Sequence, residues 1–182
     1  MERLRKGLSP GLLIWLAAAV LMLPLRWLLA WAGAVCVHEL GHLAMLKLLK
    51  LPVYAMDADA SGARITTEFR NRSQEVLCAL AGPAAGCLTV LAAPVFPRLA
   101  VCALLQSVYN LLPVYPLDGG RAMRCLAGEK AAKAMEALCL AALAAVGIYG
   151  SFVLRLGLLP LSFAAFTALR AIGRKIPCKE PR

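Results

Sequence analysis

The chain has 182 residues, of which 61% are hydrophobic and 16% charged, and its net charge is +10. Soluble domains are usually about half apolar and about a quarter charged, so this composition excludes an ordinary soluble domain and indicates a membrane protein. The apolar content also excludes a disordered chain, and the length suits a single domain over residues 1–182.

Six apolar runs follow one another along the sequence. They comprise residues 7–25, 27–46, 76–97, 99–117, 137–154 and 156–169. A helix needs about 20 apolar residues to cross the hydrocarbon layer, so we interpret each run as one transmembrane helix. The last run is short, and it can span if Arg155 and Arg170 extend to the two interfaces. The predicted fold is therefore an all-α polytopic membrane protein with about six transmembrane helices.

The basic residues sort to one side of these predicted helices. With the N-terminus in the cytoplasm, every lysine and arginine except Arg26, Arg98 and Arg155 lies on the cytoplasmic side. Cytoplasmic loops carry such an excess in most membrane proteins, so both termini are predicted to be cytoplasmic. Topology thus explains the net charge. Binding to nucleic acid is not expected, because no basic face with interleaved aromatic residues remains outside the membrane.

Two connections between the runs carry structural predictions. Residues 52–69 contain two short segments of strand-forming residues around Ser61 and Gly62, which are a turn signal. We expect a small β-hairpin there, on the cytoplasmic side, between the second and third helices. Residues 118–133 carry four basic residues, which suit the membrane surface, and are expected to form an interfacial helix or turn. The seven scattered cysteines are interpreted as apolar packing residues.

The second run contains the pattern HELGH at residues 38–42. Residues four apart on a helix share one face, so His38 and His42 can both reach one metal ion. Glu39 is offset by one residue and can act on a metal-bound water without being a ligand. This is the HExxH arrangement of zinc hydrolases. Two other interpretations are that the histidines are buried packing residues, or that they belong to a proton or ion relay. Ionisable groups at bilayer depth cost free energy, which argues against a packing role alone.

A catalytic zinc site usually has three protein ligands, whereas this chain has only two histidines. The third ligand is therefore expected to be a carboxylate or a thiolate. Asp57 and Asp59 lie in the predicted hairpin and would have to fold back into the bilayer, and Cys36 faces a different side of its helix. Asp118 is the better candidate, because it follows the fourth run where prolines and glycines unwind the backbone.

Three motifs together resemble the site-2 protease family of intramembrane zinc metalloproteases. They are HELGH at residues 38–42, AGPAAG at residues 81–86, and Asn110-x-x-Pro113-x-x-Pro116-Leu117-Asp118-Gly119-Gly120. The motifs follow the family's order and approximate spacing, and the resemblance covers essentially the whole chain. The six-helix layout is most similar to the short bacterial branch that includes a sporulation protease activating a sigma-factor precursor. Neither an inserted PDZ domain nor a C-terminal nucleotide-sensing domain is expected.

This resemblance implies a metalloendopeptidase with one Zn²⁺ ion. It implies that His38, His42 and Asp118 bind the zinc. Glu39 would be the general base, and Asn110 would position substrate, although a helix–helix hydrogen bond is the second interpretation of Asn110. The implied substrate is a membrane-bound regulatory protein, such as an anti-sigma factor or a sigma-factor precursor, in a bacterial cell membrane. The hairpin would offer this substrate a strand edge, and an inhibitory or regulatory membrane partner is a further expectation.

Two further functions stay open. A prenyl-protein type of membrane zinc protease also contains HExxH but takes its third ligand from a downstream glutamate. None of the downstream glutamates here lies in a supporting motif, whereas Asp118 does. The second is a membrane zinc-binding or transport protein without protease activity. Replacing Glu39 by glutamine separates a protease from a transporter, because it should abolish proteolysis but leave transport intact.

Overall fold

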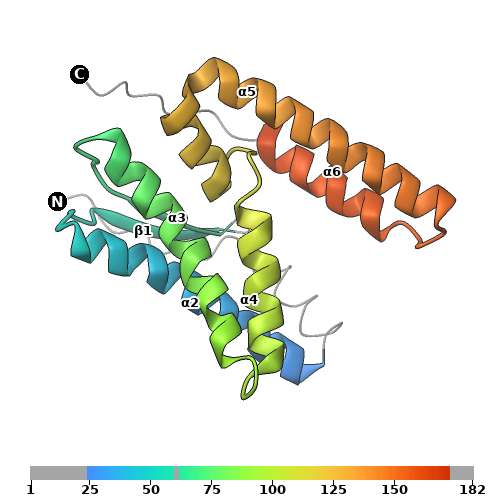
Figure 1. The fold of residues 1–182 in the computed structure, drawn as a ribbon, viewed down its shortest axis with the longest axis horizontal. Coiled ribbons are helices and arrows are strands. Elements are labelled where there is room, and N and C mark those ends of the chain that lie inside the picture. The colour runs from blue at the N-terminus through green and yellow to red at the C-terminus, as the bar shows by residue number, and fades with distance from the viewer. Residues whose placement is uncertain (1–23, 60–61, 173–182) are drawn as a thin grey trace. The chain divides into compact units, whose positions relative to one another are not determined.

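The computed structural model describes residues 24–59 and 62–172. The elements within these residues follow the chain in the order drawn in Figure 1. They are α2 (Leu25–Leu48), β1 (Ala55–Asp59), β2 (Gly62–Thr66), α3 (Arg72–Leu88), the 3₁₀ helix η1 (Thr89–Ala92), α4 (Pro97–Asn110), α5 (Asp118–Ile148), the π-helical turn η2 (Tyr149–Val153) and α6 (Leu159–Ile172). The first predicted helix, residues 7–25, lies outside the described residues except for its last two.

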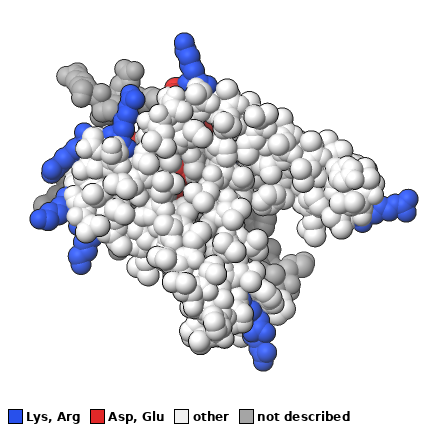
Figure 2. Space-filling view, viewed as in Figure 1, with Lys and Arg blue, Asp and Glu red and all other residues white. Residues whose placement is uncertain are grey.

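Three of the described helical segments are long and apolar enough to cross a membrane: Leu25–Leu48, Arg72–Ala92 and Asp118–Val153. Many large apolar side chains on them are exposed, including Leu29, Leu88 and Val146. Figure 2 shows lysine and arginine side chains projecting singly from a surface that is otherwise largely uncharged. An apolar outer surface of this kind is suited to lipid, so the structure supports a membrane protein. The number of six crossings stays a prediction.

The helices on either side of residues 111–117 differ from their predicted limits. The fourth run was expected to be helical over residues 99–117, but α4 ends at Asn110. Pro113 and Pro116 follow within six residues, and proline cannot donate the backbone hydrogen bond that continues a helix. Residues 118–133 are predicted to form an interfacial helix or turn of their own. In the structure α5 consists of two helical segments that meet at a kink at Gly128, so the first segment ends before the predicted residue 133.

The described residues divide into two compact units. The first contains residues 24–70 and 80–108 without the two undescribed positions, and the second contains residues 71–79 and 109–172. Helix α3 contributes residues to both units, and α4 gives its last two residues to the second. The predicted single domain over residues 1–182 stays a prediction.

In the first unit, β1 and β2 pair antiparallel, with Ala55 opposite Thr66 and Asp59 opposite Gly62. Both strands lie inside residues 52–69, the segment for which the hairpin is predicted, and residues 60–61 lie outside the described part. The hydroxyl of Thr67 donates a hydrogen bond of 2.7 Å to the carbonyl oxygen of Pro52. This bond ties the two ends of the segment together directly after α2.

In the second unit, α5 and α6 run side by side (Figure 1). Gly147 lets them approach, because a Cβ at this position would lie 3.0 Å from the carbonyl oxygen of Pro160. The ring of Tyr109 lies 5.4 Å from that of Phe163 on α6, and Arg170 donates a 3.4 Å hydrogen bond to the Tyr109 hydroxyl. These contacts fix the end of α4 against α6.

Candidate metal centre

His38 and His42 lie one turn apart on α2, and their Nε2 atoms are 3.2 Å apart. Their ring planes are inclined by 82°, with centroids 4.8 Å apart, and His38 is only 4% exposed. Two nitrogen ligands of a tetrahedral zinc ion, each bonded at about 2.0–2.1 Å, stand about 3.3 Å from each other. The two imidazoles therefore have the spacing of two ligands to one metal ion, as the HELGH pattern predicts.

The face of α2 that carries these histidines meets α3 at two glycines. A Cβ at Gly41 would lie 2.6 Å from the carbonyl oxygen of Ala81. A Cβ at Gly82 would overlap the imidazole of His42, with its Cε1 only 2.6 Å away. Both Ala81 and Gly82 belong to the AGPAAG motif at residues 81–86. The sequence alone marks this motif only as a family resemblance, whereas in the structure its small residues give the His42 ring its space.

Glu39 follows His38 directly on α2 and is half-buried. Successive helical residues are rotated by about 100°, so its carboxylate leaves the helix in a direction different from that of the His38 ring. Three further residues are alternatives to Asp118 as the third ligand. Cys36 is exposed on the same helix, and Asp57 and Asp59 belong to β1.

Asp118 belongs to the second unit, where it is the first residue of α5 and is 8% exposed. A carboxylate in the first turn of a helix is favoured by the partial positive charge of the backbone N–H groups. The guanidinium of Arg121 forms an ion pair with it, with Nη1 lying 4.0 Å from Oδ1. Asp118, which the sequence favours as the third ligand, is thus a buried carboxylate, whereas most aspartates in proteins are exposed to water.

The turn before Asp118 is tightly built. Val114 and Leu117 are almost fully buried, and the backbone N–H of Leu117 donates a 2.9 Å hydrogen bond to the carbonyl oxygen of Val114. A Cβ at Gly120 would overlap the backbone of Val114 and Tyr115. Glycine is thus required for α5 to start this close to the preceding turn. Asn110, the candidate for substrate positioning, is the half-buried last residue of α4 before the same turn.

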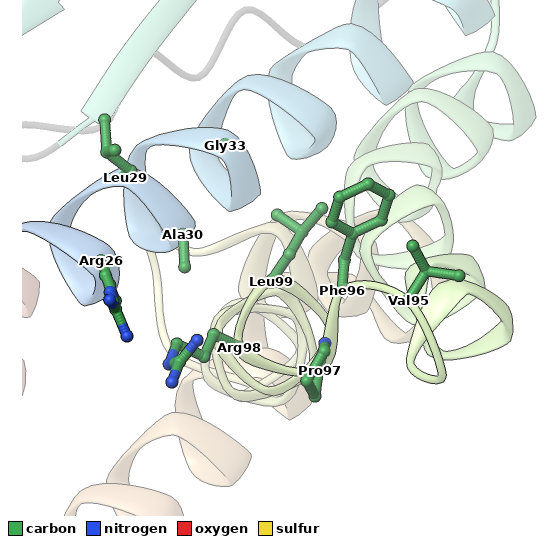
Figure 3. A pocket seen from close by; sticks show the side chains of 9 residues that line it. All are labelled: Arg26, Leu29, Ala30, Gly33, Val95, Phe96, Pro97, Arg98 and Leu99. Atoms are coloured by element: carbon green, nitrogen blue, oxygen red, sulfur yellow. The ribbon is translucent and has the colours of Figure 1, made fainter.

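A separate pocket of about 330 Å³ lies near the start of α2 (Figure 3). It is lined by apolar side chains together with Arg26 of α2 and Arg98 of α4. The Arg98 guanidinium also lies 6.0 Å from the centre of the Trp27 ring. The described residues that line the pocket include no histidine and no carboxylate, so it has no ligands for a zinc ion.

Comparison with known proteins identifies the fold. The structure is similar to that of the site-2 protease from Methanocaldococcus jannaschii, with a TM-score of 0.60 and 18% sequence identity. The match covers 93% of this chain and 89% of that protein's chain. No protein-family model matches the sequence, and no curated protein matches it. The chain therefore has the fold of a site-2 protease, while the likeness to the short bacterial branch stays a prediction.

Proposed function

We propose that this chain is a zinc-dependent intramembrane endopeptidase of the site-2 protease type. The observation that carries the proposal is the 3.2 Å separation of the two Nε2 atoms of HELGH. These atoms lie on a helix that is long and apolar enough to cross a membrane. The fold of a site-2 protease and the three motifs of that family support the same assignment.

The proposed metal ligands are His38, His42 and Asp118. Each offers one ligand atom, giving two imidazole nitrogens and one carboxylate oxygen. Such a nitrogen and oxygen set suits Zn²⁺, and three protein ligands leave the fourth position of a catalytic site open. The burial of His38 and Asp118 supports this assignment, because buried polar groups of this kind need strong partners.

When bound, Zn²⁺ supplies Lewis acidity, which lowers the pKa of water toward about 7 and polarises a peptide carbonyl. In the proposed reaction, the Glu39 carboxylate accepts a proton from the attacking water. Glu39 then donates this proton to the nitrogen of the leaving amine. Its offset from His38 by one residue leaves its oxygens outside the ligand set, as both proton transfers require.

Asn110 is proposed to hold the substrate backbone through its amide. An extended substrate segment exposes its peptide groups, whereas a helix shields them, so β1 or β2 is proposed to add the substrate as a further strand. The proposed substrate is a membrane-bound regulatory protein, such as an anti-sigma factor or a sigma-factor precursor. Location in a bacterial cell membrane and control by a regulatory membrane partner belong to the same proposal.

The test uses the full chain purified in detergent. Zinc content and cleavage of candidate membrane-tethered transcription regulators are measured for the wild type, for Glu39→Gln and for Glu68→Gln, a control at an exposed glutamate. We expect one zinc per chain in all three proteins and cleavage by the wild type and the control only. Cleavage by Glu39→Gln at the wild-type rate would overturn the proposed mechanism. Zinc flux into proteoliposomes without proteolysis would favour a transporter instead.

A further inference from the structure

The helix that begins with Asp118 is broken near its start. Gly128 has φ 79° and ψ 168°, which are not helical values. The kink separates a short segment, residues 118–127, from the long segment that follows. A segment of about ten residues is too short to be a stable helix by itself, so the position of Asp118 depends on what holds this segment.

Arg124 makes the contacts that bridge the kink. Its Nη2 donates a hydrogen bond of 3.3 Å to Oε2 of Glu136, which is twelve residues further along α5. Its Nε lies 3.9 Å from Oε2 of Glu129, directly after the kink. Its Cζ lies 4.1 Å from the centre of the Tyr115 ring, in the turn before Asp118.

These contacts are largely shielded from water. The side chains of Arg124 and Glu136 are only 14% and 16% exposed. Among the described residues, Nε and Nη1 of Arg124 find no hydrogen-bond acceptor. The guanidinium therefore depends on the Glu136 carboxylate and on the face of the Tyr115 ring for the compensation of its buried charge. Glu129 contributes less, because it is more exposed and pairs with Lys133 at 3.2 Å.

We infer that Arg124 is a positioning residue that fixes Asp118 for metal binding. Tyr115 lies three residues before Asp118 and Arg124 six residues after it, so one guanidinium holds the chain on both sides of the carboxylate. Its hydrogen bond to Glu136 also joins this part of the chain to the long segment of α5. This inference rests on the proposed function, since it assumes that Asp118 binds zinc.

The test measures the zinc affinity of the full chain in detergent by competition with a chelating dye, together with the melting temperature. The variants are Arg124→Met and Glu136→Gln. Their control is Arg170→Met, which removes another arginine that lies over an aromatic ring and bonds to a tyrosine in the same unit. We expect about tenfold weaker zinc binding in the two test variants, at the lower end of the effects of residues that support a metal ligand. Arg170→Met should lower the melting temperature but keep the wild-type affinity.

A second pair of variants tests the kink without touching Arg124. Gly128 and Gly157 have nearly equal φ values, 79° and 76°, and a Cβ at either position meets no atom within 4 Å. Alanine is therefore strained at both sites by the positive φ, and at neither site by a clash of its Cβ. We expect Gly128→Ala to weaken zinc binding several-fold and Gly157→Ala to leave it unchanged, at similar melting temperatures.

The outcomes separate this inference from the proposed function. A wild type that binds no zinc would overturn both. A wild type that binds zinc, with unchanged affinity in Glu136→Gln and Gly128→Ala, would overturn the positioning role alone. If Arg124→Met does not fold, these two variants still decide the question, because neither removes the guanidinium. An equal loss of affinity in Arg170→Met would mean that general destabilisation is the cause.

Discussion

The imidazole of His42 on α2 occupies the space in which a side chain at Gly82 on α3 would begin. Alanine is the better helix former by about 1 kcal/mol, so helix propensity alone would make Gly82→Ala stabilising. Overpacking costs about 1–3 kcal/mol and would displace the ring from its position 3.2 Å from His38. We therefore expect Gly82→Ala to weaken zinc binding and cleavage together by about tenfold or more. Zinc competition titration and a cleavage assay measure the two effects.

Gly33→Ala is the matched control for this substitution. A Cβ at Gly33 on α2 would meet only the flexible end of the Leu99 side chain, at 3.2 Å. This variant should retain the zinc affinity of the wild type. If Gly82→Ala retains it as well, the His42 ring can move without consequence and the role given to AGPAAG is wrong.

Asp118→Asn tests the third ligand. An amide oxygen carries no charge and is a weaker zinc ligand than a carboxylate, so zinc affinity should fall by about 100-fold or more, beyond the usual effect of outer-shell changes. Cleavage should fall in parallel. The shape of the side chain is conserved, so the melting temperature without zinc should change little. Asp57→Asn and Asp59→Asn, at the two carboxylates of β1, are the controls. Loss of zinc in either of these, with retention in Asp118→Asn, would move the third ligand to β1.

Zinc should stabilise the folded chain. A ligand that binds only the folded state adds about 2.7 kcal/mol at a concentration of 100 times Kd, which for a chain of this size raises the melting temperature by about 5–10 °C. Chelation should remove this increase, and added zinc should restore it. The variant His38→Ala should show no zinc-dependent increase. The 3.2 Å distance would also suit a hydrogen bond between two neutral imidazoles, and a wild type without any zinc response would favour that interpretation.

The part of the site that the sequence predicts is the part formed by neighbours on one helix. His38 and His42 are four residues apart, so helix geometry alone brings their rings together, and the structure confirms this. The role of Gly82 could not be derived in the same way. This role depends on which residues of α3 face α2. The packing of the two helices decides that, and β1 and β2 lie between them in the sequence.

The second unit shows the opposite case. The basic residues of 118–133 were interpreted as surface charges, but the Arg124 guanidinium is largely buried against Glu136 and Tyr115. Basic residues are usually predicted to be exposed because most charged side chains are solvated. This prediction fails for Arg124, because its partner Glu136 lies on the other side of the kink. The kink itself requires Gly128 at positive φ. A single glycine in a predicted interfacial helix does not reveal it, because a helix tolerates an isolated glycine at a cost of about 1 kcal/mol.

The excess of basic residues predicts the orientation of the chain, and two exposed positions test it. In a variant whose seven native cysteines are replaced by alanine, Val95→Cys marks the connection between α3 and α4, and Tyr54→Cys marks the segment between α2 and β1. With cytoplasmic termini, a membrane-impermeant maleimide should label Val95→Cys in intact cells. Tyr54→Cys should be labelled only after the membrane is permeabilised. The reverse pattern would put HELGH nearer the outer face, because His42 is 6 residues from the end of α2 that leads to Tyr54 and 17 residues from its start. It would therefore exclude a cytoplasmic substrate segment.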